Sequence, residues 1–541
     1  MTKLHTPSRS ARLKYGLFAL ALSGIGSLGF GSSVAAQSTA FRQAVAEQAS
    51  VNDAVAQFYR DTTYAPLWTG ADEGAALRRA ALLRALEDAT SHGLPDQSST
   101  VASLVEQMRS ARTARDFGQV EAALSTAFVT YAAMLQTGML NPSSIDDGMV
   151  RTRRSHDGVA ALNGLRAAQP FAYLRNLVPT SSQYRALMRE KLRLEQLMAA
   201  GGWGPTVPGS KLEPGDRGPQ VIALRNRLIA LGYMERSATA SYDQDIERAV
   251  QKFQSDHGLE EDGIVGAGTL KEINRPVRDR LKSVIIAMER ERWLSPDRGD
   301  RHVLVNQTDF TAKIVDNGDV TFETRSVIGR NQSDRRSPEF SDMMEHMVIN
   351  PSWYVPRSII TKEYLPKLRN NPNAVGHIQI TDNRGRVVSR ANTDFSQFTA
   401  RNFPYAMRQP PSRSNALGLV KFMFPNKYNI YLHDTPQKGL FKREVRAFSH
   451  GCIRLAQPFE FAYALLSRQT EDPAAFFNRI LRSGKETKVE LEQKVPVHII
   501  YRTAYVSNKG RAEFRRDVYG RDAKVWAALE QAGVALPDVQ G

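Results

Sequence analysis

Cysteine is almost absent from this sequence, because its 541 residues include only one, Cys452. A single thiol cannot form an internal disulfide, so a disulfide-stabilised fold is excluded. With no cysteine near the N-terminus, a lipoprotein anchor is not expected either. His257 has no second ligand at a useful spacing, so we expect it to be a surface or capping residue, not a metal ligand. An unpaired thiol in an oxidising compartment is a chemical liability, and its presence calls for a chemical role.

Long hydrophobic runs are also scarce. One apolar stretch, residues 15–30, is short and contains glycine and serine, and Val34-Ala35-Ala36 after it fits a cleavage site for a signal peptidase. Four basic residues and no acidic ones precede the stretch: Lys3, Arg9, Arg12 and Lys14. The pattern predicts an export signal over residues 1–36, with an uncleaved membrane anchor as the alternative. No later segment is expected to span a membrane.

Acidic residues are outnumbered by basic ones, which gives a formal net charge of +16. Loss of the four basic residues in the predicted signal would leave about +12. In an exported protein such an excess suits a polyanionic surface, such as a cell-wall polymer or lipid headgroups, and a merely solvated surface is the alternative. Nucleic acid is not an expected partner, because the chain is predicted to be exported and has no recognisable nucleic-acid-binding motif.

Helical periodicity dominates the first 275 residues. Residues 37–205 contain three stretches with apolar residues three and four positions apart, and we expect a helical scaffold domain that ends at a glycine-rich linker. An aromatic cluster from Phe58 to Trp68 is predicted to be core. Residues 211–275 read as three short helices, with Asp243 capping the second and Gly232 and Gly258 ending the first two.

The period changes from 3.6 to 2 near residue 302, which predicts a mostly β domain over residues 302–520. Asp316-Asn317-Gly318-Asp319 is a strong hairpin signal, and residues 508–510 predict a second hairpin. Helices are expected near residues 361–369 and 458–468. The last stretch, within residues 521–541, predicts a terminal helix.

The chemistry is expected in two segments of this β domain. In Tyr428–His433, alternation places Ile430 and Leu432 toward the core and Tyr431 and His433 on the other face. In Ser449-His450-Gly451-Cys452-Ile453-Arg454-Leu455, the same alternation leaves Cys452 and Arg454 facing outward. The two segments therefore predict a cleft with a thiol and an imidazole on one face.

An imidazole within reach of Cys452 would draw off its proton and make the thiolate nucleophile. His433 and His450 compete for this role, and we favour His433 because it comes from a separate strand. Asp434 should point the other way, so we expect a backbone carbonyl to orient the imidazole. The amides of Gly451 and Cys452 are candidates for an oxyanion hole. The alternative for Cys452 alone is an inert buried thiol.

Two resemblances follow from these motifs. The string FQSDHGLEEDGIVGAGTL, residues 253–270, resembles the three-helix peptidoglycan-binding domain of many wall enzymes. His433 followed by SHGCIR resembles the YkuD-type catalytic domain of L,D-transpeptidases, and segments 327–330 and 350–356 are also similar to that family. Ser337-Pro338 stands where many members have Thr-Pro. The order of the domains resembles that of the large periplasmic members of Gram-negative bacteria.

The resemblance implies a multi-domain α+β protein and a periplasmic location. It also implies a capping segment over the cleft, which we place at residues 385–427. The implied reaction is attack by Cys452 on a tetrapeptide stem of peptidoglycan, release of D-alanine, and a 3→3 cross-link to the diamino acid of a neighbouring stem. His433 would move the protons, the amides of Gly451 and Cys452 would hold the oxyanion, and Tyr431 or His450 would assist. Acylation by carbapenems is expected, and no metal or other cofactor is implied.

Four residues are expected on the substrate side of the site: Tyr431, Ser449, Arg454 and Trp353. Arg454 would pair with a substrate carboxylate or brace the loop, and a structural salt bridge is an equal alternative. Water or a lipoprotein lysine as acceptor would make the protein a carboxypeptidase or an anchoring enzyme. A non-catalytic wall-binding scaffold is the reading from another class, and a conventional cysteine protease lacks its local motif.

Overall fold

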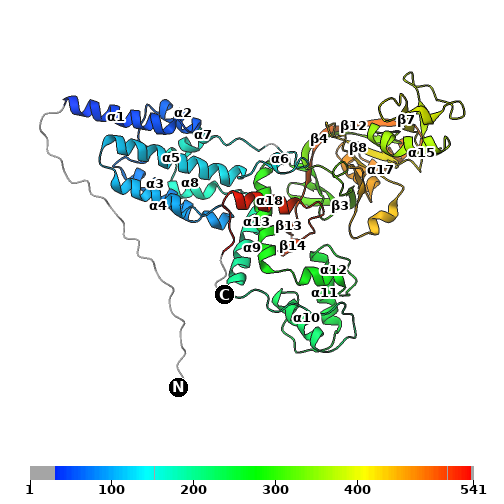
Figure 1. Cartoon of the computed structure of the whole chain (residues 1–541), viewed down its shortest axis with the longest axis horizontal. Coiled ribbons are helices and arrows are strands. Elements are labelled where there is room, and N and C mark those ends of the chain that lie inside the picture. Colours follow the sequence, from blue (N-terminus) through cyan, green and yellow to red (C-terminus); the bar gives the residue numbers. More distant parts are fainter. Residues whose placement is uncertain (1–30, 152, 508–509, 538–541) are drawn as a thin grey trace.

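The computed structural model describes residues 31–151, 153–507 and 510–537. A helical bundle occupies one end of the long axis, a β-barrel follows, and a small cap subdomain lies at the other end (Figure 1). The three-helix module of residues 211–275 lies below the junction of the bundle and the barrel in this view. The predicted signal, residues 1–36, lies mostly outside the described residues. Within the described part of the chain, no helix is long and apolar enough to cross a membrane.

The bundle is built around the aromatic cluster that the sequence placed in the core, since Phe58, Tyr59 and Trp68 are all fully buried. The carboxylate of buried Glu121 accepts hydrogen bonds from the Tyr59 hydroxyl at 2.8 Å and the Thr69 amide at 2.8 Å. The elements are α1 (Gly31–Ala49), α2 (Asp53–Asp61), α3 (Glu73–Glu87), η1 (Ala89–His92), α4 (Ser98–Ser110), α5 (Ala114–Thr137), α6 (Pro142–Ile145), α7 (Gly158–Ala167) and α8 (Pro170–Asn176).

A buried helix, α13 (Val277–Trp293), joins the bundle to the barrel, and the sequence analysis missed it. It packs against α9 (Ser182–Ala199) and α18 (Arg521–Gln531). Its charged side chains are buried in pairs: Arg290 contacts Glu339 of the barrel at 2.9 Å and Asp522 of α18 at 3.3 Å. The helix buries charged as well as apolar side chains, so its sequence shows no amphipathic stripe.

The module consists of α10 (Pro219–Ala230), α11 (Gln244–Asp256) and α12 (Ala267–Ile273), around its own apolar core. Asp243 caps α11 as predicted, accepting from the Ile246 amide at 3.1 Å. The module docks on the hairpin of β13 (Ala504–Val506) and β14 (Ala512–Phe514), where Arg515 donates to the Asp256 carbonyl at 2.7 Å. His257 is buried there, stacked on Phe253 at 3.9 Å between ring centroids, so a surface role is wrong. The predicted capping role is confirmed, because His257 is the C-cap residue of α11.

Nine strands form the sheet of the β domain, in the order β10-β3-β11-β9-β8-β4-β12-β1-β2, and a further pairing of β2 with β3 closes it into a barrel. The strands are β1 (Arg301–Asn306), β2 (Thr311–Asp316), β3 (Asp319–Gly329), β4 (Phe340–Ile349), β8 (Val420–Met423), β9 (Leu432–His433), β10 (Ala447–Ser449), β11 (Ile453–Leu455) and β12 (Thr487–Ile500). Apolar side chains fill the interior. The predicted β2–β3 hairpin is confirmed, with Asn317 and Gly318 at φ +52° and +92°.

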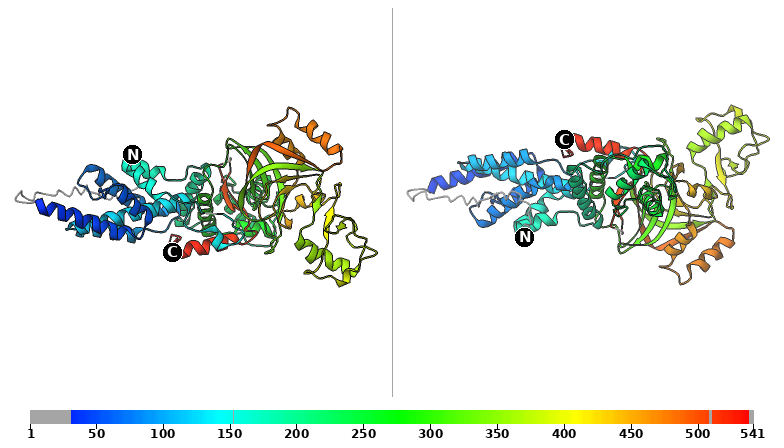
Figure 2. Two further views of the ribbon diagram at one scale, coloured as in Figure 1. Left: turned by 90° about the horizontal axis from the view of Figure 1, so that it is seen from above. Right: turned by 90° about the horizontal axis from the view of Figure 1, so that it is seen from below.

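Two helices, α16 (Pro458–Leu466) and α17 (Pro473–Arg482), accompany the barrel, and η4 (Lys438–Lys442) precedes β10. The helix predicted near residues 458–468 is α16; α17 was not predicted. The segment with α17 and the cap subdomain diverge at the far end of the barrel, as the two views of Figure 2 show.

The cap subdomain has its own three-stranded sheet, in the order β5-β7-β6, and its own apolar core from Trp353 to Leu417. Its elements are β5 (Trp353–Tyr354), α14 (Arg357–Ile359), the π-helix η2 (Ile360–Tyr364), α15 (Leu365–Asn370), β6 (Gln379–Thr381), η3 (Phe395–Gln397) and β7 (Ala406–Gln409). The sequence placed the cap at residues 385–427. The structure differs at both ends, because the helices near residue 360 pack into the cap and β8 pairs in the barrel.

Candidate active site

His433 lies on the outer face of the barrel, under the cap. Its neighbour Leu432 points into the core and is fully buried, as alternation predicted. The imidazole itself is only 4% exposed, because the cap covers this face. Its Nδ1–H donates to the carbonyl of Asp434. The Asp434 carboxylate turns away and accepts from Lys438 at 2.6 Å, so a backbone carbonyl orients the imidazole, as expected.

Cys452 sits at the end of a tight loop between β10 and β11. The Ser449 hydroxyl accepts from the Gly451 amide at 3.1 Å and donates to the Cys452 carbonyl at 2.5 Å. The Ser337 hydroxyl holds the Gly451 carbonyl at 2.6 Å. Gly451 has φ +120°, a conformation that residues with a Cβ rarely adopt. The loop is therefore fixed by hydroxyl groups on both of its sides.

These contacts change two expectations for the loop. Ser449 was predicted to touch substrate, but it is 1% exposed and its hydroxyl is used within the loop. The Gly451 amide was a candidate oxyanion donor, but it already donates to Ser449. The amide of Cys452 is the one that these hydrogen bonds leave for an oxyanion.

The thiol and the imidazole line the same cavity, with His433 on β9 and Cys452 in the loop directly before β11. Parallel pairing of β9 with β11 sets His433 opposite Arg454, so Cys452, two positions earlier, is its diagonal neighbour. The thiol donates a hydrogen bond to the Asn429 carbonyl at 3.4 Å. Burial raises the pKa of Cys452 to about 11, against the opposing effect of hydrogen bonds from Tyr431. Burial, with Arg454 nearby, lowers the pKa of His433 to about 3. The resting pair is thus a neutral thiol and a neutral imidazole, not the thiolate that the sequence suggested.

His450, the rival base, turns toward the cap. Its Nε2 lies 2.7 Å from Oε1 of Glu363 in η2, and Arg335 donates to the same oxygen at 2.8 Å. Lys362 reaches Asp334 beside them at 2.7 Å. His450 therefore links the nucleophile loop to the cap, and its predicted catalytic role stays a prediction.

A cavity of about 700 Å³ opens above Cys452, between the barrel and the cap. Seven of the predicted site residues line this cavity: Cys452, His433, Tyr431, Ser449, Arg454, His450 and Trp353. Trp353 and Tyr364 of the cap meet edge to face, with ring centroids 6.4 Å apart, and form an aromatic wall. Arg454 donates to Gln437 at 2.6 Å and has no carboxylate partner among the described residues, so the predicted salt bridge is not formed.

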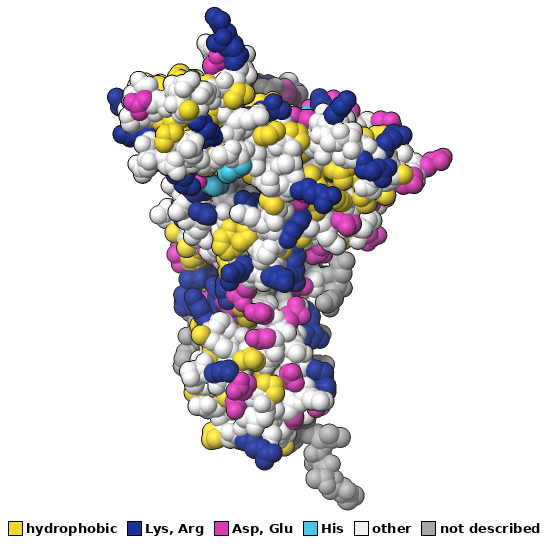
Figure 3. All heavy atoms as spheres, turned by 90° about the vertical axis from the view of Figure 1, so that its right-hand side faces the viewer, with side chains coloured by type: hydrophobic (Ala, Val, Ile, Leu, Met, Phe, Trp, Pro, Cys, Tyr) yellow, Lys and Arg dark blue, Asp and Glu magenta, His cyan; other side chains and the backbone are white. Residues whose placement is uncertain are grey.

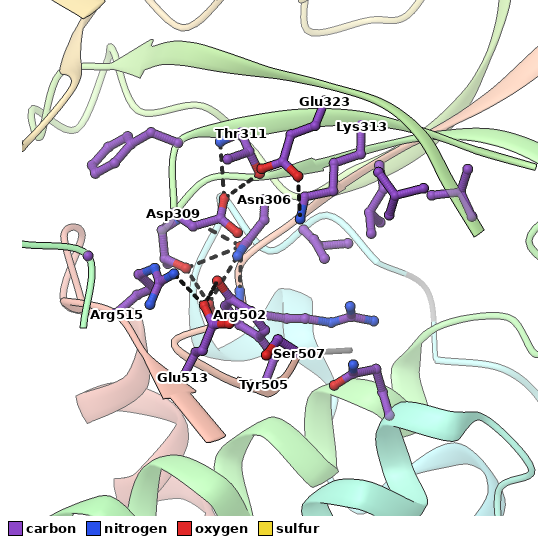
Figure 4. A pocket seen from close by; sticks show the side chains of 18 of the residues that line it. Asn306, Asp309, Thr311, Lys313, Glu323, Arg502, Tyr505, Ser507, Glu513 and Arg515 are labelled. Carbon is purple, nitrogen blue, oxygen red and sulfur yellow. Dashed lines mark hydrogen bonds and ion pairs between the residues drawn. The ribbon is translucent and has the colours of Figure 1, made fainter. Parts of the chain in front are cut away.

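A second cavity, of about 1380 Å³, lies between module, scaffold and barrel on the side of β1 and β2. Its charged groups largely pair with one another: Lys313 with Glu323 at 3.3 Å and Arg515 with Glu513 at 2.7 Å (Figure 4). None of the predicted catalytic or substrate-binding residues lines it. The smaller cavity is therefore the candidate active site.

The surface around the site has charges of both signs. Figure 3 shows the face at the cap end, where Lys and Arg side chains are interspersed with Asp and Glu side chains and a histidine side chain reaches the surface. Within the described residues, no group of three or more His, Cys, Asp or Glu side chains is arranged to hold a metal ion.

Sequence reasoning missed Lys421 and Glu363. Lys421 faces outward in the alternating strand Val420-Lys421-Phe422, so its face was readable from the pattern, but its place beside His433 required the strand register. Glu363 had no local signal, because the cap brings it to His450 from 87 positions away.

Three family models match the chain. Residues 300–499 match the L,D-transpeptidase catalytic domain, residues 53–190 a scaffold domain, and residues 217–273 a model described as "Putative peptidoglycan binding domain". The chain is 35% identical over 227 residues to a protein of Haemophilus influenzae named "Putative L,D-transpeptidase". That match covers 41% of this chain and 45% of the relative, so the chain spans less than half the length of that protein.

Solved structures of similar proteins include an L,D-transpeptidase from Xylanimonas cellulosilytica, 15% identical, with a TM-score of 0.17, covering 55% of this chain and all of that one. Another is from Stackebrandtia nassauensis, 14% identical, with a TM-score of 0.20, covering 55% of this chain and 97% of that one. TM-scores this low do not support a conclusion about the fold or the function of this chain. The family models and the site motif identify an L,D-transpeptidase catalytic domain joined to a peptidoglycan-binding domain.

Proposed function

We propose that this protein forms 3→3 cross-links between peptidoglycan stems through a thioester on Cys452, with His433 as the base and acid. The observation that supports it most is the position of the single thiol of the chain. It lies on the floor of a 700 Å³ cavity, one diagonal step from a buried imidazole, inside the matched catalytic domain.

In the first half-reaction Cys452 attacks the carbonyl between the diamino acid and the terminal D-alanine of a tetrapeptide stem. The thiol proton passes to His433 as the sulfur–carbon bond forms, and the Cys452 amide donates to the oxyanion. Collapse of the intermediate breaks the carbon–nitrogen bond, and His433 returns the proton to the departing amine of D-alanine. A thioester remains on Cys452.

In the second half-reaction the side-chain amine of a neighbouring stem attacks the thioester. His433 takes a proton from that amine and gives one back to the sulfur, which restores the thiol. Because both resting groups are neutral, the proton transfer is expected to accompany attack on a bound substrate and not to precede it.

The acceptor is tested with a disaccharide-tetrapeptide, whose products are read by mass. Dimers that have lost one D-alanine support transpeptidation, whereas free tripeptide alone would make the protein a carboxypeptidase. Transfer to a lipoprotein lysine would appear only when such a peptide is added. Cys452→Ala and His433→Ala should abolish every product, while Lys494→Met, an exposed change on β12, should not. A cellular phenotype that is unchanged by Cys452→Ala would favour a non-catalytic wall-binding scaffold.

Two further expectations follow from the same site. A carbapenem should leave a covalent adduct on the intact protein, and Cys452→Ala should lose it. The predicted export signal and the wall substrate suggest a periplasmic location, and cell fractionation with a cleaved N-terminus at residue 37 would support it.

A further inference from the structure

Three side chains form a row across the outer face of the barrel. Antiparallel pairing of β8 with β9 sets Lys421 opposite His433, and parallel pairing of β9 with β11 sets Arg454 opposite it from the other side. Residues that face each other across paired strands project on the same side of the sheet. Val420 and Phe422, on either side of Lys421, are fully buried in the barrel core, so Lys421 points outward with His433.

Neither cation of this row has a carboxylate partner among the described residues. Lys421 is half-buried and makes no hydrogen bond or ion pair there. Arg454 contacts only the neutral Gln437, and its Nε is buried without a partner. Charges that are partly withdrawn from water are normally paired in proteins, because an uncompensated charge is unfavourable there. Two unpaired cations on either side of one imidazole therefore call for an anion that forms during the reaction.

The other groups around His433 do not supply that anion. The Asp434 carboxylate is bound to Lys438 at 2.6 Å. The charge of Glu486 raises the pKa of Lys421 against the effect of burial, but its carboxylate makes no ion pair with Lys421 and lies 3.9 Å from Arg408. Tyr431 faces the imidazole with ring centroids 5.6 Å apart, and the cap contributes the Leu417 backbone. Among the groups around His433, the Cys452 thiol is therefore the one that can become the anion.

We propose that Lys421 is a positioning residue which, with Arg454, stabilises negative charge on the Cys452 sulfur and drives the proton from His433 to the departing amine. Positive charge on both sides of the imidazole makes its protonated form a strong acid, and the same charges favour a thiolate or oxyanion beside it. The directions agree: burial, then Arg454 and Lys421, lower the pKa of His433, and the same cations oppose the rise in the pKa of Cys452. The role of the thiolate as an acyl acceptor rests on the proposed function.

The single cysteine permits a test that needs no peptide substrate. Iodoacetamide alkylation, followed by intact mass against pH, reports the thiolate fraction of Cys452 alone. Lys421→Met keeps the length of the side chain and removes its charge. Its alkylation profile should move to higher pH by about half to one unit, which makes the reaction roughly three- to tenfold slower at pH 8.

Three further variants make the result decisive. Lys421→Arg should keep the wild-type profile, because it restores the charge. Lys494→Met, which removes an exposed lysine paired with Glu345 at 2.7 Å, should do the same. Lys421→Gln runs in parallel in case Lys421→Met fails to fold, as judged by near-ultraviolet circular dichroism. An unshifted profile in the folded uncharged variant, or an equal shift in Lys421→Arg, overturns the proposal. A shift without any cross-linking activity would sustain it while refuting the proposed function.

Discussion

Ser337 offers the sharpest test of how the nucleophile loop is held. Its hydroxyl is fully buried, donates to the Gly451 carbonyl at 2.6 Å and accepts from the Gly329 amide at 3.0 Å. Ser337→Ala removes both hydrogen bonds and leaves two buried backbone groups without this partner. An unsatisfied buried group costs about 1–3 kcal/mol, so we expect a loss of about 2–3 kcal/mol of stability, concentrated in this loop.

The catalytic effect should exceed what global stability alone predicts, because Gly451 precedes the nucleophile directly. We expect acylation of Cys452 by a carbapenem to slow about tenfold, which corresponds to about 1.4 kcal/mol in the barrier. Stopped-flow acylation and urea denaturation measure the two effects separately. Ser337→Thr retains the hydroxyl and serves as the control. Wild-type acylation and an unchanged urea midpoint in Ser337→Ala would refute the argument that this hydroxyl holds the loop.

Two other predictions concern the same loop and its titration. Gly451→Ala should reduce acylation at least tenfold, because Gly451 has φ +120° and an added Cβ would lie 3.2 Å from Ile430. Acylation of the variant at the wild-type rate would contradict this. Acylation by a carbapenem should stay level from pH 6 to 9, because burial raises the pKa of Cys452 to about 11, so the neutral thiol that reacts with His433 as its base persists over this range. His433, with a pKa lowered to about 3, should add no acidic limb above pH 5, and a rate that peaks near pH 7 would count against both values.

The motifs predicted the orientation of individual side chains better than the boundaries of the elements. Alternation in Tyr428–His433 and around Cys452 placed each side chain on its face, because one buried face imposes a strict period of two. The Asn317-Gly318 turn was readable for the same local reason. The long helix α13 was not, since Arg290 and its neighbours are buried in ion pairs that no single sequence pattern announces. The cap limits failed because Trp353 and Leu417 meet only in three dimensions.

The protonation states could not be read from the motif either. The sequence shows a thiol and an imidazole, and model compounds then suggest an ion pair. In the structure both groups are buried under the cap and strands β8 and β11 set Lys421 and Arg454 beside the imidazole, so both groups remain uncharged at rest. These pKa shifts depend on the segment that covers the site. That segment includes Trp353, which lies 80 positions before His433 in the chain.

The docking of the three-helix module has a consequence for the geometry of wall synthesis. Arg515 and Arg511 fasten the module to the β13–β14 hairpin, through the Asp256 and Gly232 carbonyls at 2.7 and 2.9 Å. A domain joined by a flexible linker would occupy many positions relative to the catalytic domain. A domain fastened in this way stays at a fixed distance from the catalytic cavity, so any polymer held by the module would reach Cys452 at one fixed spacing.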